Sequence, residues 1–272
     1  MKNKIIIIGK RSLIASFLKK NLSLIHNITL KNFSEVKKNH NLGRFDYLIN
    51  CSSHKIYKKK NINKDRDVFF AKKLKNSNCK LIMISTSKVY GKGYCKKKNE
   101  SLVCQPRTSY GKSRFFVENK IREIIPKQFL ILRLANLINF DTRKKTGSKT
   151  AINKMIKDLF FKNIITVPIK KNVKDFITMN YFLLSIKFLI KKKLIGIYNL
   201  SSGFGTSLHK VAKLLILGYG KGIVEKKKII TDSFVLDNKK LSIILKKKLS
   251  KKNLYREIIT IGKQMIANKK NV

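Results

Sequence analysis

A run of four isoleucines from Ile5 to Ile8, ended by Gly9, is the feature that most constrains the fold. An unbroken β-branched run favours a strand buried on both faces, as the strands of a parallel sheet are. Over residues 12–24, apolar residues then recur at helical spacing with lysines between them. A strand, a glycine turn and a helix in this order predict the first unit of an α/β sheet.

The same alternation continues along the chain. We expect further strands at residues 27–30, 47–50, 80–85, 129–134 and 195–200. Helical periodicity predicts helices at 68–74, 109–125, 150–161, 179–190, 207–217 and 239–249. Strands separated by helices indicate an α/β protein with a Rossmann-type, doubly wound parallel sheet.

The charge of the chain is extreme, with 63 Lys and Arg against 14 Asp and Glu and a formal net charge of +49. Only nine of the basic residues are arginine, and lysines occur in every segment. Nucleic-acid readers tend to cluster charge on one face and to use arginine forks. We therefore expect non-specific, salt-sensitive DNA binding and no specific nucleic-acid partner.

The cysteines suggest neither a metal site nor a disulfide framework. Cys51, Cys79, Cys95 and Cys104 include no C-x-x-C pair, and the four histidines lie at no metal-ligand spacing from them. The most apolar later stretch, residues 179–190, contains Lys187 and is shorter than the ~20 residues of a membrane helix. The first residues also lack a signal-peptide core. We expect reduced thiols in a soluble, cytoplasmic protein without a membrane partner.

The turn after the first strand reads Gly9-Lys10-Arg11-Ser12-Leu13-Ile14-Ala15. A dinucleotide-binding turn has glycine at three positions. Here Gly9 occupies the first, whereas Ser12 stands at the second and Ala15 at the third. Ser12 is a suitable N-cap, and the helix amides with Lys10 and Arg11 would attract a pyrophosphate. An ordinary strand-to-helix turn has the same residues, so this motif alone leaves both interpretations open.

The position of the cofactor ribose follows about 20 residues later, at the end of the second strand. That strand ends Leu30-Lys31-Asn32, without the Asp or Glu that binds the 2′-hydroxyl of NAD. Lys31 would instead accommodate a 2′-phosphate. The sequence therefore favours NADP over NAD.

Two segments about 20 residues apart carry the strongest signal. They read Ser85-Thr86-Ser87-Lys88-Val89-Tyr90-Gly91 and Thr108-Ser109-Tyr110-Gly111-Lys112-Ser113-Arg114. They resemble the extended short-chain dehydrogenase/reductases, the NAD(P)-dependent epimerases, dehydratases and reductases of nucleotide sugars, whose pattern is S-[ST]-x-x-V-Y-G followed by Y-x-x-x-K. The resemblance spans nearly the whole chain and includes Asn50-Cys51-Ser52-Ser53, residues 132–136, 174–177, 196–203 and 206–207, and the tail segment 237–241.

The resemblance implies roles for these residues. Tyr110 would be the general acid/base, its pKa lowered by a cation and the oxidised nicotinamide, and Thr86 would hydrogen-bond the same substrate oxygen. It implies cofactor contacts by Gly9, Arg11, Ser12, Lys31, Asn50, Cys51, Ser52, Tyr110 and Arg114, and substrate contacts by Ser87, Asn136 and Asp175. The alternatives are a helix-face tyrosine and a strand-end threonine that caps a turn.

Arg114 departs from the pattern, because the family has lysine there. It lies on the same helix face as Tyr110, whereas Lys112 points away. A guanidinium is bulkier and planar, so it is not equivalent to an ammonium. Either Arg114 supports a slower or altered reaction, or the chain binds a dinucleotide without turnover. An Arg114→Lys variant distinguishes them: a rise in hydride transfer indicates a compromised site, and a loss indicates an adapted arginine.

Ser87 and Lys88 stand where the family's dehydratases have an acidic pair, which favours an epimerase or reductase of a nucleotide sugar. A catalytically silent dinucleotide-binding scaffold is the alternative, and a nucleic-acid-binding protein comes third. We expect residues 1–138, joined by 175–200, to form the dinucleotide-binding domain, and residues 139–174 and 201–272 to form a small, interwoven C-terminal substrate domain. The resemblance also implies a homodimer.

Overall fold

The computed structural model describes residues 2–38, 41–52, 64–91, 97–139, 151–170, 172–229, 233–246 and 249–269. The chain forms two compact units. The first comprises residues 1–91, 100–134 and 183–199, and the second comprises residues 92–99, 135–182 and 200–272. Residues 92–99, 135–138, 175–182 and 200 thus fall in the second unit, whereas the sequence analysis assigned them to the dinucleotide-binding domain.

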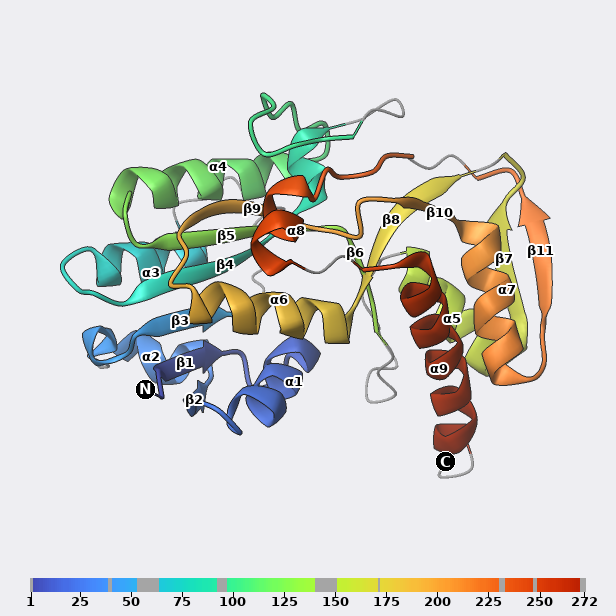
Figure 1. Ribbon diagram of the computed structural model, residues 1–272, viewed down its shortest axis with the longest axis horizontal. Helices are drawn as coiled ribbons and strands as arrows, with labels where there is room; N and C mark the ends of the chain where they lie inside the picture. The colour runs from blue at the N-terminus through green and yellow to red at the C-terminus, as the bar shows by residue number, and fades with distance from the viewer. Residues whose placement is uncertain are drawn as a thin grey trace. The chain divides into compact units, whose positions relative to one another are not determined.

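A six-stranded sheet forms the centre of the first unit, in the order β2-β1-β3-β4-β5-β9 (Figure 1). Its strands are β1 (Lys4–Ile8), β2 (Asn27–Lys31), β3 (Tyr47–Asn50), β4 (Lys80–Thr86), β5 (Phe129–Leu134) and β9 (Gly196–Leu200). The pairs from β2 to β5 are parallel. The strand order reverses between β1 and β3, and ligands of such sheets bind at the carboxyl ends of the strands beside this point. The predicted doubly wound sheet is confirmed.

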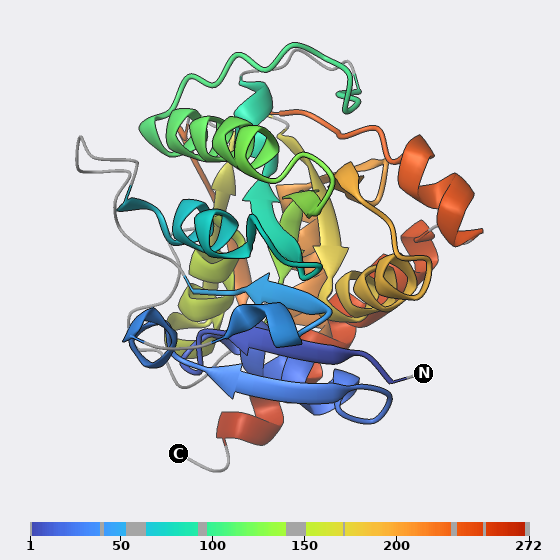
Figure 2. The same ribbon diagram turned by 90° about the vertical axis from the view of Figure 1, so that its left-hand side faces the viewer.

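Helices cover both faces of this sheet. They are α1 (Leu13–Leu22), α2 (Phe33–Lys38), α3 (Arg66–Leu74), α4 (Ser109–Ile124) and α6 (Met179–Lys191), with 3-10 turns η1 (Leu42–Arg44) and η4 (Ser87–Tyr90). Figure 2 shows α3 and α4 on one face and α6 on the other. Side chains from α3 and α4, such as Phe70, Leu74 and Ile121, pack with Leu81 and Met83 of β4 and are fully buried. Burial of this apolar face holds the amino ends of both helices beside the sheet.

The second unit contains a three-stranded sheet in the order β10-β8-β6 and a separate parallel pair of β7 and β11. Its strands are β6 (Asn136–Ile138), β7 (Ile164–Pro168), β8 (Val173–Thr178), β10 (Gly205–Ser207) and β11 (Ile223–Lys227). Its helices are α5 (Ala151–Lys162), α7 (Leu208–Tyr219), α8 (Lys239–Leu245) and α9 (Lys251–Lys269). Helices α7 and α9 approach closely at Gly218, where a Cβ would lie 2.0 Å from the carbonyl oxygen of Ile259.

The single helix predicted at residues 239–249 is wrong in its second half. Helix α8 ends at Leu245, because Lys246 adopts a left-handed conformation with φ 50° and donates its N–H to the Ile243 carbonyl. The sequence analysis also did not predict helices α2 and α9 or strands β6, β7, β8, β10 and β11. Strand β11 reads I-V-E-K-K and has no buried position, so it lacks the apolar run that marks a strand.

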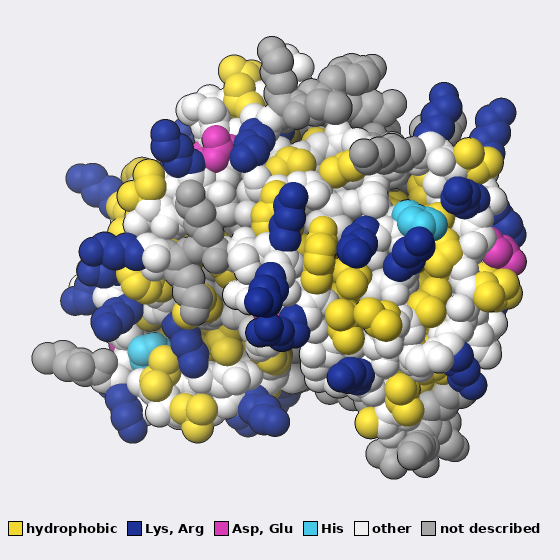
Figure 3. Space-filling model, turned by 45° about the vertical axis from the view of Figure 1, so that its right-hand side comes forward, with side chains coloured by type: hydrophobic (Ala, Val, Ile, Leu, Met, Phe, Trp, Pro, Cys, Tyr) yellow, Lys and Arg dark blue, Asp and Glu magenta, His cyan; other side chains and the backbone are white. Residues whose placement is uncertain are grey.

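Lysine and arginine side chains are distributed over the face shown in Figure 3 and do not gather into one patch there. Acidic side chains are sparse on this face. Among the described residues, no helix combines the length and the apolar character that a membrane crossing requires.

Candidate functional site

The turn after β1 requires glycine at position 9. Gly9 has a φ of 117°, and a Cβ there would lie 3.1 Å from the carbonyl carbon of Cys51 and from the amide nitrogen of Ser52. The predicted N-cap is confirmed, because the Ser12 side chain accepts from the Ala15 N–H of α1. Other amides of the first helical turn lack intrahelical partners, so they attract an anion. Arg11 adds an exposed cation beside them.

Glu35 lies beside the predicted ribose position and was missed by the sequence analysis. Its carboxylate contacts the ammonium of Lys10 at 2.8 Å and that of Lys31 at 3.5 Å, and it accepts the Asn32 N–H at 2.6 Å. The hydrogen bonds from Lys10 and Asn32 lower the pKa of Glu35 to about 2. Asn32 followed three residues later by Glu35 is a capping-box pattern, which was the signal available in the sequence.

Polar side chains lie at the carboxyl end of β3 and directly after it. Asn50 is buried; its amide donates to Asp67 at 2.8 Å, and its Oδ1 accepts from the N–H and the hydroxyl of Ser52. Burial raises the pKa of the Cys51 thiol, so this group stays neutral. Cys51, Cys79 and Cys104 are free thiols, whereas Cys95, like Ser53, lies outside the described residues.

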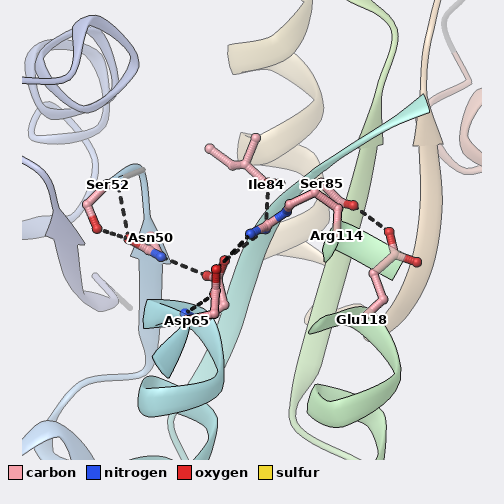
Figure 4. A network of polar contacts seen from close by, with 8 residues as sticks. Asn50, Ser52, Asp65, Ile84, Ser85, Arg114 and Glu118 are labelled. Carbon is pink, nitrogen blue, oxygen red and sulfur yellow. Dashed lines mark hydrogen bonds and ion pairs between the residues drawn. The ribbon is translucent and has the colours of Figure 1, made fainter. Parts of the chain in front are cut away.

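Arg114 lies in a buried ion-pair network (Figure 4). Its Nη2 donates to Asp67 at 2.8 Å and to the Ile84 carbonyl at 3.2 Å, and its Nη1 lies 3.6 Å from Asp65. Burial by itself lowers the pKa of Arg114, but Asp67, Asp65 and Tyr110 together raise it, so the guanidinium is charged. The sequence analysis predicted the cation of Arg114 but not the carboxylates of Asp65 and Asp67. The available signal was the Asp-Arg-Asp run, because aspartates at a helix start act as caps.

Tyr110 and Arg114 line the same cavity, as four-residue spacing on α4 predicts. The cavity has a volume of about 190 Å³ and is lined by Ile14, Asn50, Cys51, Ser52, Asp65, Arg66, Asp67, Ile84, Tyr110, Ser113 and Arg114. Tyr110 is 41% exposed. The structure therefore brings five of the predicted site residues together within the first unit.

Thr86 and Ser87 are not part of the cavity lining. Thr86 is the last residue of β4, where its side chain caps η4 by accepting the Lys88 N–H at 3.3 Å. This contact matches the alternative interpretation of Thr86 as a turn cap, although its hydroxyl hydrogen remains available to donate to a ligand. Gly9, Arg11, Ser12 and Lys31 also lie outside the lining.

A second buried ion pair joins α4 to β5. Glu118 is fully buried and accepts from Arg133 at 2.7 Å and from the Ser85 hydroxyl. The Arg133 guanidinium stacks on the Tyr90 ring, 4.8 Å from its centroid, and the Tyr90 hydroxyl donates to Asn199 at 2.8 Å. Burial raises the pKa of Tyr90 to about 12, so its hydroxyl keeps its proton. These contacts fix the carboxyl end of β4 against α4 and β5.

Asn136 and Asp175 meet in the second unit, where the Asn136 amide donates to the Asp175 backbone carbonyl at 2.8 Å. The Asp175 carboxylate is 2% exposed and accepts from the N–H and hydroxyl of Ser202 and the N–H groups of Gly203 and Leu236. Burial raises the pKa of Asp175 to about 6, although these hydrogen bonds oppose the shift. The carboxylate therefore joins the segment after β9 to the segment before α8.

Comparison with known proteins identifies a matching family and solved structures that share the fold. Residues 4–178 match the NAD dependent epimerase/dehydratase family. No curated protein sequence matches the chain.

Solved structures share the fold at low sequence identity. A UDP-N-acetylglucosamine 4-epimerase from Methanobrevibacter ruminantium M1, in complex with UDP-N-acetylmuramic acid, has a TM-score of 0.81 and 16% identity over 98% of this chain and 100% of its own. A dTDP-4-dehydrorhamnose reductase ortholog from Clostridium acetobutylicum has a TM-score of 0.76 and 16% identity over 96% and 100%. A dTDP-glucose 4,6-dehydratase from Bacillus anthracis, in complex with NAD, has a TM-score of 0.74 and 14% identity over 96% of each chain.

Proposed function

Because the chain belongs to the NAD-dependent epimerase/dehydratase family, we propose that it is an epimerase or reductase of a nucleotide sugar with a nicotinamide dinucleotide cofactor. The observation that carries this proposal is the cavity in which Tyr110 and Arg114 face the residues that follow β3. Support comes from the structurally similar epimerase with its UDP-sugar and from the dehydratase with NAD. The absence of an acidic pair after Thr86 favours epimerisation or reduction over dehydration.

The residues of the first unit fit a dinucleotide. The Gly9 turn brings the amino end of α1 close to β3 without a side chain between them, and Ser12 and Arg11 would hold the pyrophosphate there. Asn50, Cys51 and Ser52 would contact the cofactor from the end of β3, and Tyr110 and Arg114 from α4. A bound nicotinamide would supply the hydride acceptor and donor.

Tyr110 would move the proton that accompanies hydride transfer. Its phenolate would accept the proton of a sugar hydroxyl during oxidation, and its phenol would return it to a carbonyl oxygen during reduction. The Arg114 guanidinium favours the phenolate electrostatically. Thr86, at the carboxyl end of β4, would donate a hydrogen bond to the same substrate oxygen.

The proposal assigns substrate contacts to Ser87, Asn136 and Asp175. The Asp175 carboxylate makes four hydrogen bonds within the second unit. These contacts favour a role in which Asp175 orders the segments around Ser202 and Leu236, which would then contact the sugar. Ser87 is buried within η4.

The preference for NADP that Lys31 predicts is opposed by Glu35. This carboxylate is ionised and already contacts both Lys31 and Lys10. A 2′-phosphate would compete with it for the lysines and be repelled by its charge, whereas a 2′-hydroxyl could donate to it. The choice between NAD and NADP therefore depends on Glu35, and the NADP preference stays a prediction.

A catalytically silent dinucleotide-binding scaffold is the second candidate. The observation that favours it is the engagement of Arg114 by Asp67, Asp65 and the Ile84 carbonyl, which uses donors that a catalytic cation would direct to a ligand. Homodimer formation and a cytoplasmic location stay predictions under both candidates.

Mass spectrometry of ligands retained by the purified chain tests the proposal, followed by incubation with UDP- and dTDP-sugars and either dinucleotide. We expect a retained dinucleotide and either an epimerised sugar or a change in absorbance at the reduced nicotinamide band. A bound dinucleotide with no turnover of any nucleotide sugar would support the silent scaffold. Failure to bind either dinucleotide at moderate salt would contradict both candidates.

A further inference from the structure

The contacts of Arg114 use most of its hydrogen-bonding capacity. A guanidinium has five N–H donors in a fixed plane. Both donors of Nη2 are used, one by Asp67 and one by the Ile84 carbonyl, and Nη1 faces Asp65. The Nε atom is buried and has no hydrogen-bond partner among the described residues. Asp67, Asp65 and Ile84 therefore leave the second N–H of Nη1 unused, and this is the donor of Arg114 available to a ligand.

A lysine at position 114 would have no N–H donor left for a ligand. An ammonium carries three donors, which equals the number of acceptors that Asp67, Asp65 and Ile84 present around this side chain. Both carboxylates are nearly buried, with side-chain exposures of 5% for Asp67 and 9% for Asp65. Buried carboxylates hold a cation strongly, because leaving them without it is costly.

Asp67 also connects Arg114 to the loop after β3. One carboxylate oxygen accepts from the Asn50 amide at 2.8 Å, and the other accepts from Arg114 at 2.8 Å. Asn50 in turn accepts from the N–H of Ser52. Figure 4 shows Asn50 and Arg114 pointing toward the start of α3, where Asp65 is labelled. The orientation of Arg114 and that of the 50–52 loop thus depend on the same carboxylate.

We propose that Asp67 is a positioning residue for the dinucleotide and forms one functional unit with Arg114, so that arginine is required at position 114 because aspartate occupies position 67. This inference rests on the proposed function. Asp67 holds the guanidinium by its Nη2 edge and leaves Nη1 for the cofactor. An Arg114→Lys substitution made alone therefore does not improve the site but weakens it.

A double-mutant cycle tests this dependence with dinucleotide affinity as the readout. The dissociation constant of the better-binding dinucleotide is measured by isothermal titration calorimetry at moderate salt, where non-specific attraction by the lysines is screened. We expect Arg114→Lys to weaken binding about tenfold, which corresponds to about 1.4 kcal/mol. In an Asp67→Asn background, which also binds more weakly than the unaltered chain, the same substitution should weaken binding by less than about threefold.

Controls separate positioning from folding. Glu123→Gln on the exposed side of α4 makes the same chemical change as Asp67→Asn and should leave affinity unchanged. The unfolding midpoint of each variant is measured without dinucleotide, because a purely structural role would lower the midpoint without changing the affinity of the folded protein. If Asp67→Asn does not fold, Arg114→Lys alone still decides, since it retains a cation between both carboxylates.

Unchanged or tighter binding by Arg114→Lys would overturn the inference, as would an equal loss in both backgrounds. Each of these outcomes is distinct from failure of the proposed function, in which the unaltered chain binds neither dinucleotide.

Discussion

Glu118 and Arg133 form a salt bridge of 2.7 Å in which neither side chain exposes more than 3% of its surface. The pair joins α4 to β5, and Glu118 also accepts from Ser85 of β4. Removing one partner of a buried pair leaves the other charge without compensation, which is more costly than losing an exposed pair.

We therefore expect Glu118→Gln to lower the free energy of unfolding by roughly 3 kcal/mol. Thermal or denaturant unfolding, monitored by circular dichroism, measures this change. Glu123→Gln breaks the exposed pair with Lys120 on the same helix and should cost less than about 1 kcal/mol. Equal effects of the two variants would show that the buried pair contributes no more than a surface pair.

Gly9→Ala should destabilise the chain by about 1–3 kcal/mol and weaken dinucleotide binding, because the residue combines a positive φ with close contacts to Cys51 and Ser52. Gly196→Ala is the matched control, since Gly196 has a φ of 102° but no atom within 4 Å of a Cβ. Comparing the unfolding free energies of both variants separates the cost of a positive φ from the cost of the close contacts to Cys51 and Ser52. A smaller loss for Gly9→Ala than for Gly196→Ala would contradict the argument.

Tyr110→Phe should reduce turnover of a nucleotide sugar by about 10²–10⁴-fold while leaving dinucleotide affinity within about threefold. The ring and its packing are retained, and only the hydroxyl that would transfer the proton is lost. Steady-state kinetics and calorimetry measure the two effects. Turnover that survives the substitution would remove Tyr110 from the acid/base role.

Glu35→Gln should shift the ratio of NADP to NAD affinity toward NADP by about tenfold or more. The substitution removes the carboxylate that contacts Lys10 and Lys31, so both ammonium groups become available to a 2′-phosphate. Titration of both dinucleotides at two salt concentrations measures the ratio. An unchanged ratio would mean that the ribose end of the cofactor does not reach this cluster.

Asp175 should make stability fall as the pH rises from about 4 to about 6. Its pKa in the folded chain is raised to about 6, so between these values the folded state retains a proton that the unfolded state has released. The contribution of this proton to the free energy of unfolding is complete below the pKa of Asp175 in the unfolded chain. It is lost as the pH rises through about 6 and amounts to roughly 3 kcal/mol. The difference in unfolding free energy between the unaltered chain and Asp175→Asn isolates it. A difference that does not vary with pH would contradict the raised pKa.

The alternation of strands and helices that builds the central sheet was predictable because its signals are local. The isoleucine run of β1, the capping Ser12 and the four-residue spacing of Tyr110 and Arg114 each specify geometry within a few residues. In the second unit, strands such as β10 and β11 are short or exposed, so their pairing depends on distant partners that periodicity does not reveal.

The chemical environment of the site was decided by tertiary structure. The sequence by itself determined that a cation follows Tyr110 on one helix face and that Gly9 ends the first strand. Only the folded chain places Asp67, 47 residues away, against Arg114 and places Glu35 between Lys10 and Lys31. A side chain's charge and donors are encoded locally, but which of them remain available to a ligand depends on partners brought by other elements.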